Sequence, residues 1–185
     1  MTADSSIKIQ VCTLEQLDAS LDSLAELLYL CVQAGASVNF ILPFPESDAK
    51  AWWIKQRKSI EEGSNILLLA LANEGQKVAG CVMMGLAEQP NQPHRADVKK
   101  MLVHPEFRRR GIGRALLQMV EHEALKRNRW LLNLDTEVGS SGERLYRAQG
   151  YIAVGVVPEF ALTNDGRSRV STVFMYKLLK NPEDA

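Results

Sequence analysis

The chain has 185 residues, a length that suits one domain able to bury its own core. Its 22 Lys and Arg balance its 22 Asp and Glu, which argues against a nucleic-acid-binding protein and gives no support to a membrane-surface one. Cys12, Cys31 and Cys81 are too far apart for a zinc or disulfide motif, so we expect reduced core thiols and no metal site. The start, residues 1–6, is polar and lacks a signal-peptide core, and no apolar run could span a membrane; we expect a cytoplasmic protein.

The first half of the chain mixes patterns typical of strands and of helices. Alternating apolar and polar residues predict strands, whereas apolar residues spaced by three and four predict a helix face. Thr13 stands where the N-cap of the first helix belongs, with Gln16 three residues later. In chain order the patterns predict a strand over 7–11, helices over 14–33 and 47–62, and a hairpin of strands over 66–72 and 78–86.

The second half alternates strands with helices. Two prolines make residues 88–94 a loop, and Gly150 stands where a C-terminal helix cap belongs. The predicted elements are strands over 96–103, 131–134, 152–157 and 170–179 and helices over 111–126 and 141–149. Hairpins and strand–helix–strand crossovers both occur, so we expect one α/β domain built on a mixed sheet.

The turn from Arg108 to Arg114 lies between a predicted strand and a predicted helix. The first turn of a helix presents unpaired N–H groups and a partial positive charge, glycines allow close approach to the backbone, and arginines add forked donors. Together these features predict an anion site suited to a diphosphate. The candidate cofactor contacts are Arg108, Arg109, Arg110, Gly111, Ile112, Gly113 and Arg114.

Three other readings of this turn are weaker. A dinucleotide-binding fingerprint would need a third glycine where Leu116 stands, although Asp135 lies about where its ribose-binding acid would. A P-loop would need a Gly-Lys pair, which this turn lacks. Taken alone, the arginines could also form a solvated charge run.

Arg108-x-x-Gly111-x-Gly113, preceded by Val103-His104-Pro105, resembles the coenzyme A loop of the GNAT acetyltransferase superfamily. The stretch from Glu143 to Tyr151, with its Leu145-Tyr146 and Gly150-Tyr151 pairs, is similar to a helix and strand of the same family. The resemblance implies a single N-acetyltransferase domain over residues 1–185, with its cofactor half at about 96–151. It also implies a mostly antiparallel seven-stranded sheet flanked by about four helices, and acetyl-CoA as cosubstrate.

Three further stretches resemble a bacterial member of the family that acetylates a small β-lactam-containing amino acid. They are residues 35–38, 131–137 and 165–167. This finer resemblance implies a small-molecule amine as acceptor, with a detoxifying or antibiotic-resistance role. A protein or peptide N-acetyltransferase and a non-catalytic acetyl-CoA sensor are the alternatives. We expect no nucleic-acid or membrane partner, and a monomer or homodimer.

The family resemblance assigns Tyr146 as the general acid that protonates the leaving thiolate, and a phenol of ordinary pKa, about 10, suits that step. Two carboxylates are candidate bases. Asp97 stands where many members carry a glutamate, and Asp135 ends an apolar strand where a raised pKa is expected. Glu137 is a weaker third candidate.

The remaining site predictions concern positioning. The resemblance implies that the backbone of Met101, Leu102 and Val103 holds the pantetheine arm and polarises the thioester carbonyl. Where many members have a coenzyme-contacting Asn, this chain has Gly139, so Ser140 or Ser141 is expected to substitute. Residues 159–169 are expected to form a lid, and His104 to belong to the turn rather than to act as a base. The candidate pocket liners are Ser37, Asn39, Phe40, Trp52 and Trp53, with Asp135 as a possible partner of the substrate ammonium.

Overall fold

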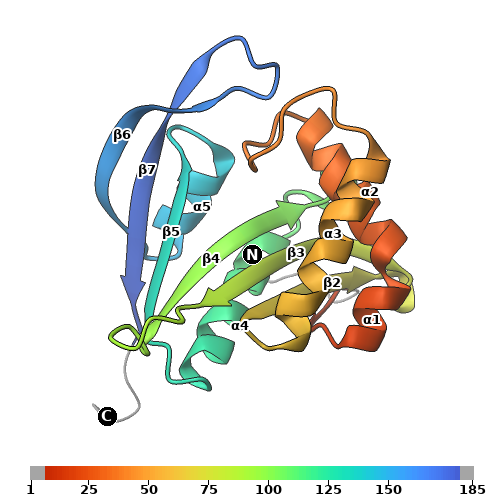
Figure 1. Ribbon diagram of the computed structural model, residues 1–185, viewed down its shortest axis with the longest axis horizontal. Coiled ribbons are helices and arrows are strands. Elements are labelled where there is room, and N and C mark those ends of the chain that lie inside the picture. The colour runs from red at the N-terminus through yellow and green to blue at the C-terminus, as the bar shows by residue number, and fades with distance from the viewer. Residues whose placement is uncertain (1–6, 180–185) are drawn as a thin grey trace.

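The computed structural model describes residues 7–179, and residues 1–6, tested above for a signal peptide, lie outside that range. The strands are β1 (Lys8–Val11), β2 (Asn65–Ala72), β3 (Lys77–Leu86), β4 (Arg95–Val103), β5 (Leu131–Glu137), β6 (Ile152–Leu162) and β7 (Arg169–Leu178). They form one sheet in the order β1-β2-β3-β4-β5-β7-β6 (Figure 1). Among the described residues, only β4 and β5 pair in parallel, which confirms the mixed, mostly antiparallel seven-stranded sheet.

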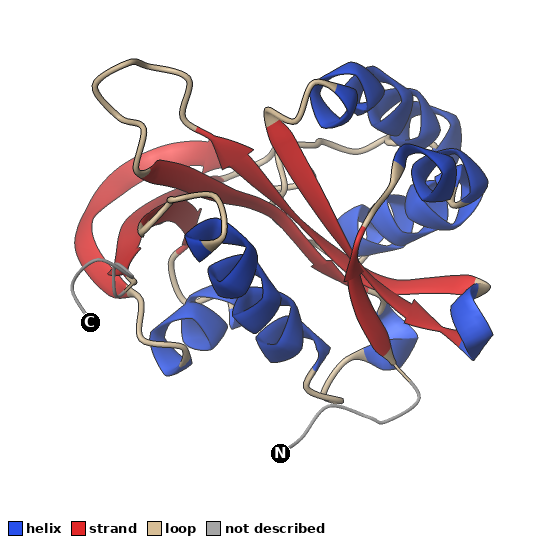
Figure 2. Cartoon of the chain, turned by 90° about the horizontal axis from the view of Figure 1, so that it is seen from below, coloured by secondary structure: helices blue, strands red, loops and turns tan. Residues whose placement is uncertain are grey.

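Helices cover both faces of this sheet (Figure 2). They are α1 (Leu14–Ala19), α2 (Leu21–Gln33), α3 (Glu46–Glu61), α4 (Ile112–Leu125) and α5 (Ser141–Ala148), with short 3-10 turns η1 (Asn73–Gly75) and η2 (Pro105–Phe107). One hydrophobic cluster packs α1, α2 and α3 on one face, and a second packs α4 and α5 on the other. Within residues 7–179, no helix is both long and apolar enough to cross a membrane.

The prediction of one helix over 14–33 is wrong, because the chain breaks at Ser20 into α1 and α2. Leu17 and Leu24 lie on either side of the break, and both are fully buried in the same cluster. The spacing of leucines by three and four residues therefore continues across the break. Because of the break, residues 7–179 contain five α-helices instead of the expected four or so. The predicted cap is confirmed: the Thr13 hydroxyl and the Gln16 side chain form a reciprocal capping box.

Helix α3 begins at Glu46 after Pro45, and not at the predicted Ser47. Strand β5 runs on past Leu134 to Glu137, because its polar end pairs with β7. Strand β6 continues past Pro158 to Leu162, five residues beyond the prediction. It can do so because it is an edge strand, where proline and a register shift between Val157 and Ala161 are tolerated.

The three cysteines are free and buried, which confirms their prediction as core thiols. Burial raises the pKa of Cys12 to about 12, and the pKa values of Cys31 and Cys81 are raised by the same cause. They therefore remain protonated at neutral pH.

The sheet splits between its two parallel strands. Pairing of β4 with β5 covers only Arg95↔Leu131, Ala96↔Leu132 and Asp97↔Asn133. Beyond Asp97 the two strands diverge (Figure 1), and β4 carries a bulge opposite Cys81 and Met83 of β3. Lys100 lies in the bulge with a left-handed backbone, φ 53°. Asp97 lies where the pairing ends, and Asp135 lies on β5 beyond that point.

Candidate active site

The arginine–glycine turn has the geometry of an anion site. Gly111 is the N-cap residue of α4 with φ 78°, and no side chain caps the helix. Arg109 is also left-handed, with φ 65°. An alternation of this kind turns successive backbone N–H groups toward one concave surface, and the helix dipole adds positive potential. The N–H groups of the first turn are thus left for a ligand.

The turn is fixed against helix α5. A Cβ atom on Gly113 would lie 2.9 Å from Cδ2 of Leu145, so a larger residue at this position would have to displace the Leu145 side chain. Tyr146 follows Leu145 on the same helix. The two sequence motifs, separated by some thirty residues, therefore meet in space through a direct contact.

The arginines surround this turn. Arg108 Nε donates to the carbonyl oxygen of Val103 at 3.3 Å, and the Arg110 guanidinium lies over the Phe107 ring at 5.2 Å from its centroid. Arg109 and Arg114 are exposed. The arrangement surrounds the N-terminus of α4 with positive charge, as a diphosphate requires.

The last residues of β4 point their side chains into the two cores. Leu102 is buried, and Met101 and Val103 are partly buried. The Val103 carbonyl also accepts from Cys31 Sγ at 3.5 Å. Any role of this segment toward the pantetheine arm therefore falls to its backbone, along the open side of the divergence.

Tyr146 is 6% exposed, and its ring packs edge-on against Tyr151 at 5.6 Å. Burial raises the pKa of Tyr146 far above its usual range, and the charge of Asp135 raises it further. The expectation of an ordinary phenol pKa is therefore wrong, because the sequence did not show how deeply α5 buries this side chain. Tyr146 stays protonated at every physiological pH and is a hydrogen-bond donor.

Asp135 lies on β5 beyond the point where the strands separate. Burial raises the pKa of the Asp135 carboxyl, while the charge of Lys100 works in the opposite direction. Asp135 and Tyr146 are thus within electrostatic reach of each other. A carboxylate with a raised pKa close to a protonated phenol is the pairing that an acid–base reaction needs.

The other two carboxylates differ in setting. Asp97 is the last residue of β4 paired with β5, so it marks the fork itself. Its Oδ2 lies 3.7 Å from Nη2 of Arg95, and about half of its side chain is exposed. Glu137 is at the far end of β5, where it pairs with Thr172 of β7.

Ser140 caps helix α5. Its hydroxyl accepts from the backbone N–H of Glu143 at 3.1 Å and lies 3.3 Å from the Thr136 hydroxyl. Ser141 is exposed at the start of the helix. Gly139 has φ 78°, a conformation that asparagine tolerates better than most residues.

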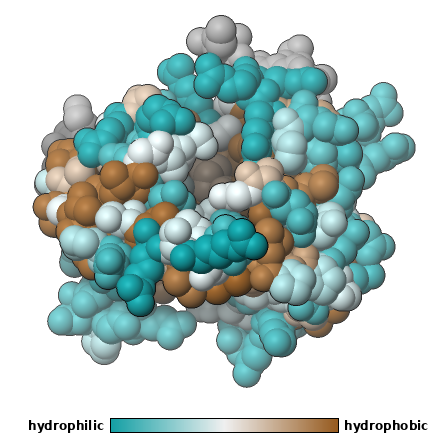
Figure 3. All heavy atoms as spheres, turned by 90° about the horizontal axis from the view of Figure 1, so that it is seen from above, coloured by the Kyte–Doolittle hydropathy of each residue, from teal (hydrophilic) through white to brown (hydrophobic). Residues whose placement is uncertain are grey.

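A small cavity, about 190 Å³ in volume, lies between the α2–α3 loop and the β6–β7 hairpin. It is lined by Ser37, Asn39, Phe40, Ile41, Ala161, Leu162 and Asn164. Three of the five predicted liners are among them. Figure 3 looks onto this end of the molecule, where apolar side chains gather among hydrophilic ones.

The two tryptophans do not line this cavity. Trp53 is fully buried, and its Nε1 donates to the carbonyl of Leu24 at 2.9 Å, so it is a core residue and its prediction as a liner is wrong. Trp52 contacts Phe40 edge to face at 6.0 Å. The helical spacing of the pair could not distinguish the buried side of α3 from the side toward Phe40.

His104 is structural, as expected. It is 2% exposed, and its Nδ1 accepts from the backbone N–H of Glu106, which fixes the ring in the turn η2. Burial, aided by the charge of Lys77, lowers the pKa of His104.

Lys100 is a charged residue of this region that the sequence analysis missed. Its Nζ donates to the carbonyl of Val38 at 2.6 Å and lies 4.8 Å and 5.1 Å from the ring centroids of Phe40 and Trp52. Burial lowers the pKa of Lys100 from 10.5 to about 8. The signal was present: two consecutive lysines, Lys99 and Lys100, cannot both face solvent on a regular strand.

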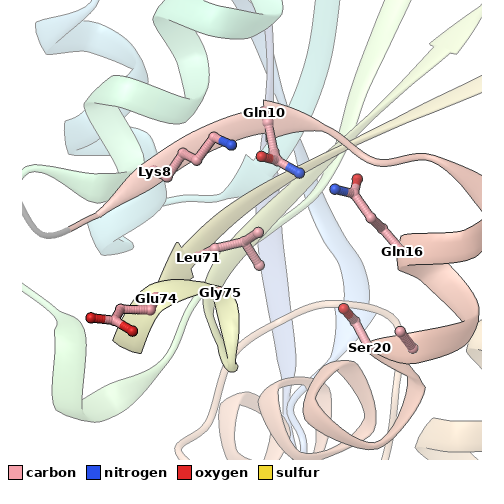
Figure 4. A pocket seen from close by; sticks show the side chains of 8 residues that line it. Lys8, Gln10, Gln16, Ser20, Leu71, Glu74 and Gly75 are labelled. Carbon is pink, nitrogen blue, oxygen red and sulfur yellow. The ribbon is translucent and has the colours of Figure 1, made fainter.

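A larger hollow, about 440 Å³, lies at the β1 edge of the sheet between η1 and α1 (Figure 4). Its lining is Lys8, Gln10, Gln16, Ala19, Ser20, Leu71, Glu74 and Gly75. In Figure 4 the Glu74 carboxylate points away from the hollow. This site contains none of the predicted catalytic residues.

Comparison with known proteins agrees with this geometry. Residues 64–153 match the family model described as an acetyltransferase (GNAT) domain. Among solved structures, a phosphinothricin acetyltransferase from Sinorhizobium meliloti in complex with acetyl-CoA is 19% identical, with a TM-score of 0.75, over 94% of this chain and 89% of that one. The protein yncA from Salmonella typhimurium, with its cofactor acetyl-CoA, is 17% identical, with a TM-score of 0.75, over 95% of both chains. A ribosomal-protein-alanine N-acetyltransferase from Brucella melitensis is 23% identical, with a TM-score of 0.73, over 93% of this chain and 99% of that one.

At these identities the structural likeness shows the fold, and the family match adds the class of protein. Together they support the GNAT acetyltransferase superfamily. The match over residues 64–153, together with the fold, supports an acetyl-CoA-dependent acetyltransferase of the GNAT type.

Proposed function

We propose that this enzyme transfers the acetyl group of acetyl-CoA to a primary amine of a small molecule, directly, in a ternary complex. The observation that carries the proposal is the divergence of β4 and β5. Asp135 and Tyr146 lie beside this divergence, and the uncapped N-terminus of α4 lies at one end of it. Diphosphate binding at the α4 turn and main-chain contacts along residues 101–103 would hold the thioester between the separated strands.

The chemistry requires a base and a proton donor. Asp135, whose pKa is raised by burial, takes a proton from the substrate ammonium, directly or through a water; Asp97 at the fork is the second candidate. The freed amine attacks the thioester carbonyl, a C–N bond forms and the C–S bond breaks. Water takes the second proton of the nitrogen and afterwards restores the proton that Tyr146 gives to the thiolate. Tyr146 donates its hydrogen to the departing thiolate. Because its pKa is high, Tyr146 first forms a hydrogen bond to the sulfur and transfers the proton afterwards.

A small acceptor is favoured by the size and closure of the cavity. Its volume of about 190 Å³ is below the range for drug-sized ligands. The β6–β7 hairpin closes over it, because Leu42 N–H donates to the carbonyl of Asn164 at 2.7 Å and Asn164 Nδ2 donates to the carbonyl of Ala36 at 3.0 Å. A polypeptide tail would have to displace this contact.

Two resemblances point the same way. The stretches at residues 35–38, 131–137 and 165–167 resemble the tabtoxin resistance protein, and a phosphinothricin acetyltransferase shares the fold. We therefore propose an amino-acid toxin or antibiotic as the acceptor. The alternative, acetylation of a protein N-terminus, draws on the likeness to the ribosomal-protein-alanine N-acetyltransferase.

The test is thiol release from acetyl-CoA with a panel of β-lactam amino acids, other amino acids, polyamines and peptides. Release with small amines and not with peptides is expected. Release only with peptides would favour the alternative, and tight acetyl-CoA binding without release for any amine would indicate a sensor.

A further inference from the structure

Lys100 adopts a backbone conformation that its residue type disfavours. Its φ of 53° lies within a strand, in the bulge of β4, and left-handed non-glycine residues of this kind cost energy and cluster at functional sites. The bulge turns the Lys100 side chain toward the α2–α3 loop. A bulge commonly re-aims one side chain next to an active site.

The ammonium of Lys100 is desolvated without a full counter-charge. Its partners are the carbonyl of Val38 and the faces of two aromatic rings, which carry only partial charges. Within residues 7–179, it forms no ion pair. Besides Asp135, the ionisable groups that influence Lys100 are Cys81, which is protonated, and Lys99, which repels it.

Asp135 is the one anion in that set. It is close enough for each charge to alter the pKa of the other, yet no ion pair joins them. Lys100 on β4 and Asp135 on β5 both lie past Asp97↔Asn133, the last pair that joins the two strands. Phe40, which Lys100 contacts, also lines the 190 Å³ cavity, so the Lys100 ammonium lies next to a wall of that cavity.

We infer that Lys100 is the carboxylate-binding residue of the acceptor site, so that the acceptor carries a carboxylate near its reactive amine. Asp135 receives the ammonium end and Lys100 the carboxylate end, with the remaining ammonium N–H groups of Lys100 as donors. The inference rests on the proposed function and assigns to Lys100 the recognition of the carboxylate that an amino-acid acceptor carries. If Lys100 only held residues 38–40 against β4, it would make the same contacts, but the enzyme would show no preference for acceptors that carry a carboxylate.

The experiment compares amino acids with their own carboxamides, which keep the amine and lose the negative charge. Thiol release from acetyl-CoA is measured for both members of each pair with the wild type, Lys100→Met and Lys100→Arg. Lys99→Met, which removes the exposed neighbouring lysine, is the matched control. Folding of each variant is checked by circular dichroism and thermal unfolding.

We expect Lys100→Met to lower kcat/KM for the amino acids by roughly 10- to 100-fold, the range for one charge-assisted hydrogen bond, and for the carboxamides by less than about threefold. Lys100→Arg should recover part of the loss, and Lys99→Met should show none. Equal losses of kcat/KM for the amino acids and for their carboxamides would overturn the inference. They would indicate that Lys100 only holds residues 38–40 against β4.

Two further outcomes keep this inference separate from the proposed function. A wild type that acetylates the carboxamides, or amines without a carboxylate, as well as the amino acids contradicts the inference while the function stands, whether or not Lys100→Met folds. A wild type that releases thiol with none of these amines overturns the proposed function itself.

Discussion

Asn164 at the tip of the β6–β7 hairpin donates from Nδ2 to the carbonyl oxygen of Ala36 at 3.0 Å, across 128 positions of sequence. A second contact from the same nitrogen reaches the Val32 carbonyl at 3.3 Å. The C-terminal hairpin is thereby fastened to the end of α2, above the cavity. The predicted lid over 159–169 thus has a defined point of attachment.

Asn164→Ala should loosen this closure. The side chain supplies two hydrogen bonds to carbonyls, each worth about 1 kcal/mol net, so we expect the KM for the acceptor to rise several-fold while the KM for acetyl-CoA is unchanged. Steady-state kinetics with both substrates measures this. Arg167→Ala, an exposed residue of the same hairpin, is the control, and an equal effect there would show that Asn164 has no special role.

Tyr146→Phe should keep acetyl-CoA binding and slow turnover by roughly 10²-fold or more, the range for general acid catalysis. The ring fills the same space beside Tyr151, so the fold should be retained. Binding is measured by calorimetry and turnover by thiol release. Unchanged turnover would remove Tyr146 from the mechanism.

Gly111→Val should weaken acetyl-CoA binding. A valine is strained at φ 78°, and its side chain would crowd the anion site at the start of α4. The control is Gly63→Val, which carries the same kind of strain at φ 74° after α3, with nothing within 4 Å of the added Cβ. Comparable stability losses are expected in both variants, but the loss of affinity only in the first; normal affinity in Gly111→Val would mean that the diphosphate binds elsewhere.

Lys100 predicts a pH dependence of stability. Burial lowers its pKa from 10.5 to about 8, so between these values the unfolded chain holds a proton that the folded chain has lost. Stability rises with pH wherever the unfolded state binds more protons. The free energy of unfolding of the wild type, relative to Lys100→Met, should therefore increase between about pH 8 and pH 10.5. Denaturant titrations across this range measure the difference, and a flat profile would mean that Lys100 is solvated.

Several features of this protein follow from local sequence. The glycines of the α4 turn, the Thr13 capping box and the alternation of β1 depend on neighbours a few residues away, and such patterns can be read directly. The proposed cofactor loop could be suggested from the sequence for the same reason, since a diphosphate site needs only backbone N–H groups and nearby arginines. The break at Ser20 was not, because both helices bury one continuous row of leucines.

The acceptor site depended on tertiary structure. The divergence of β4 from β5, the burial of Tyr146 and the placement of Lys100 against Phe40 all join residues far apart in sequence. Their pKa values are set by packing, which no local pattern encodes. The sequence by itself was enough to predict the fold class and to suggest the acetyl-CoA loop. Only the tertiary structure placed Lys100 and Asp135 on the two strands past the end of their pairing, where we propose that the acceptor binds.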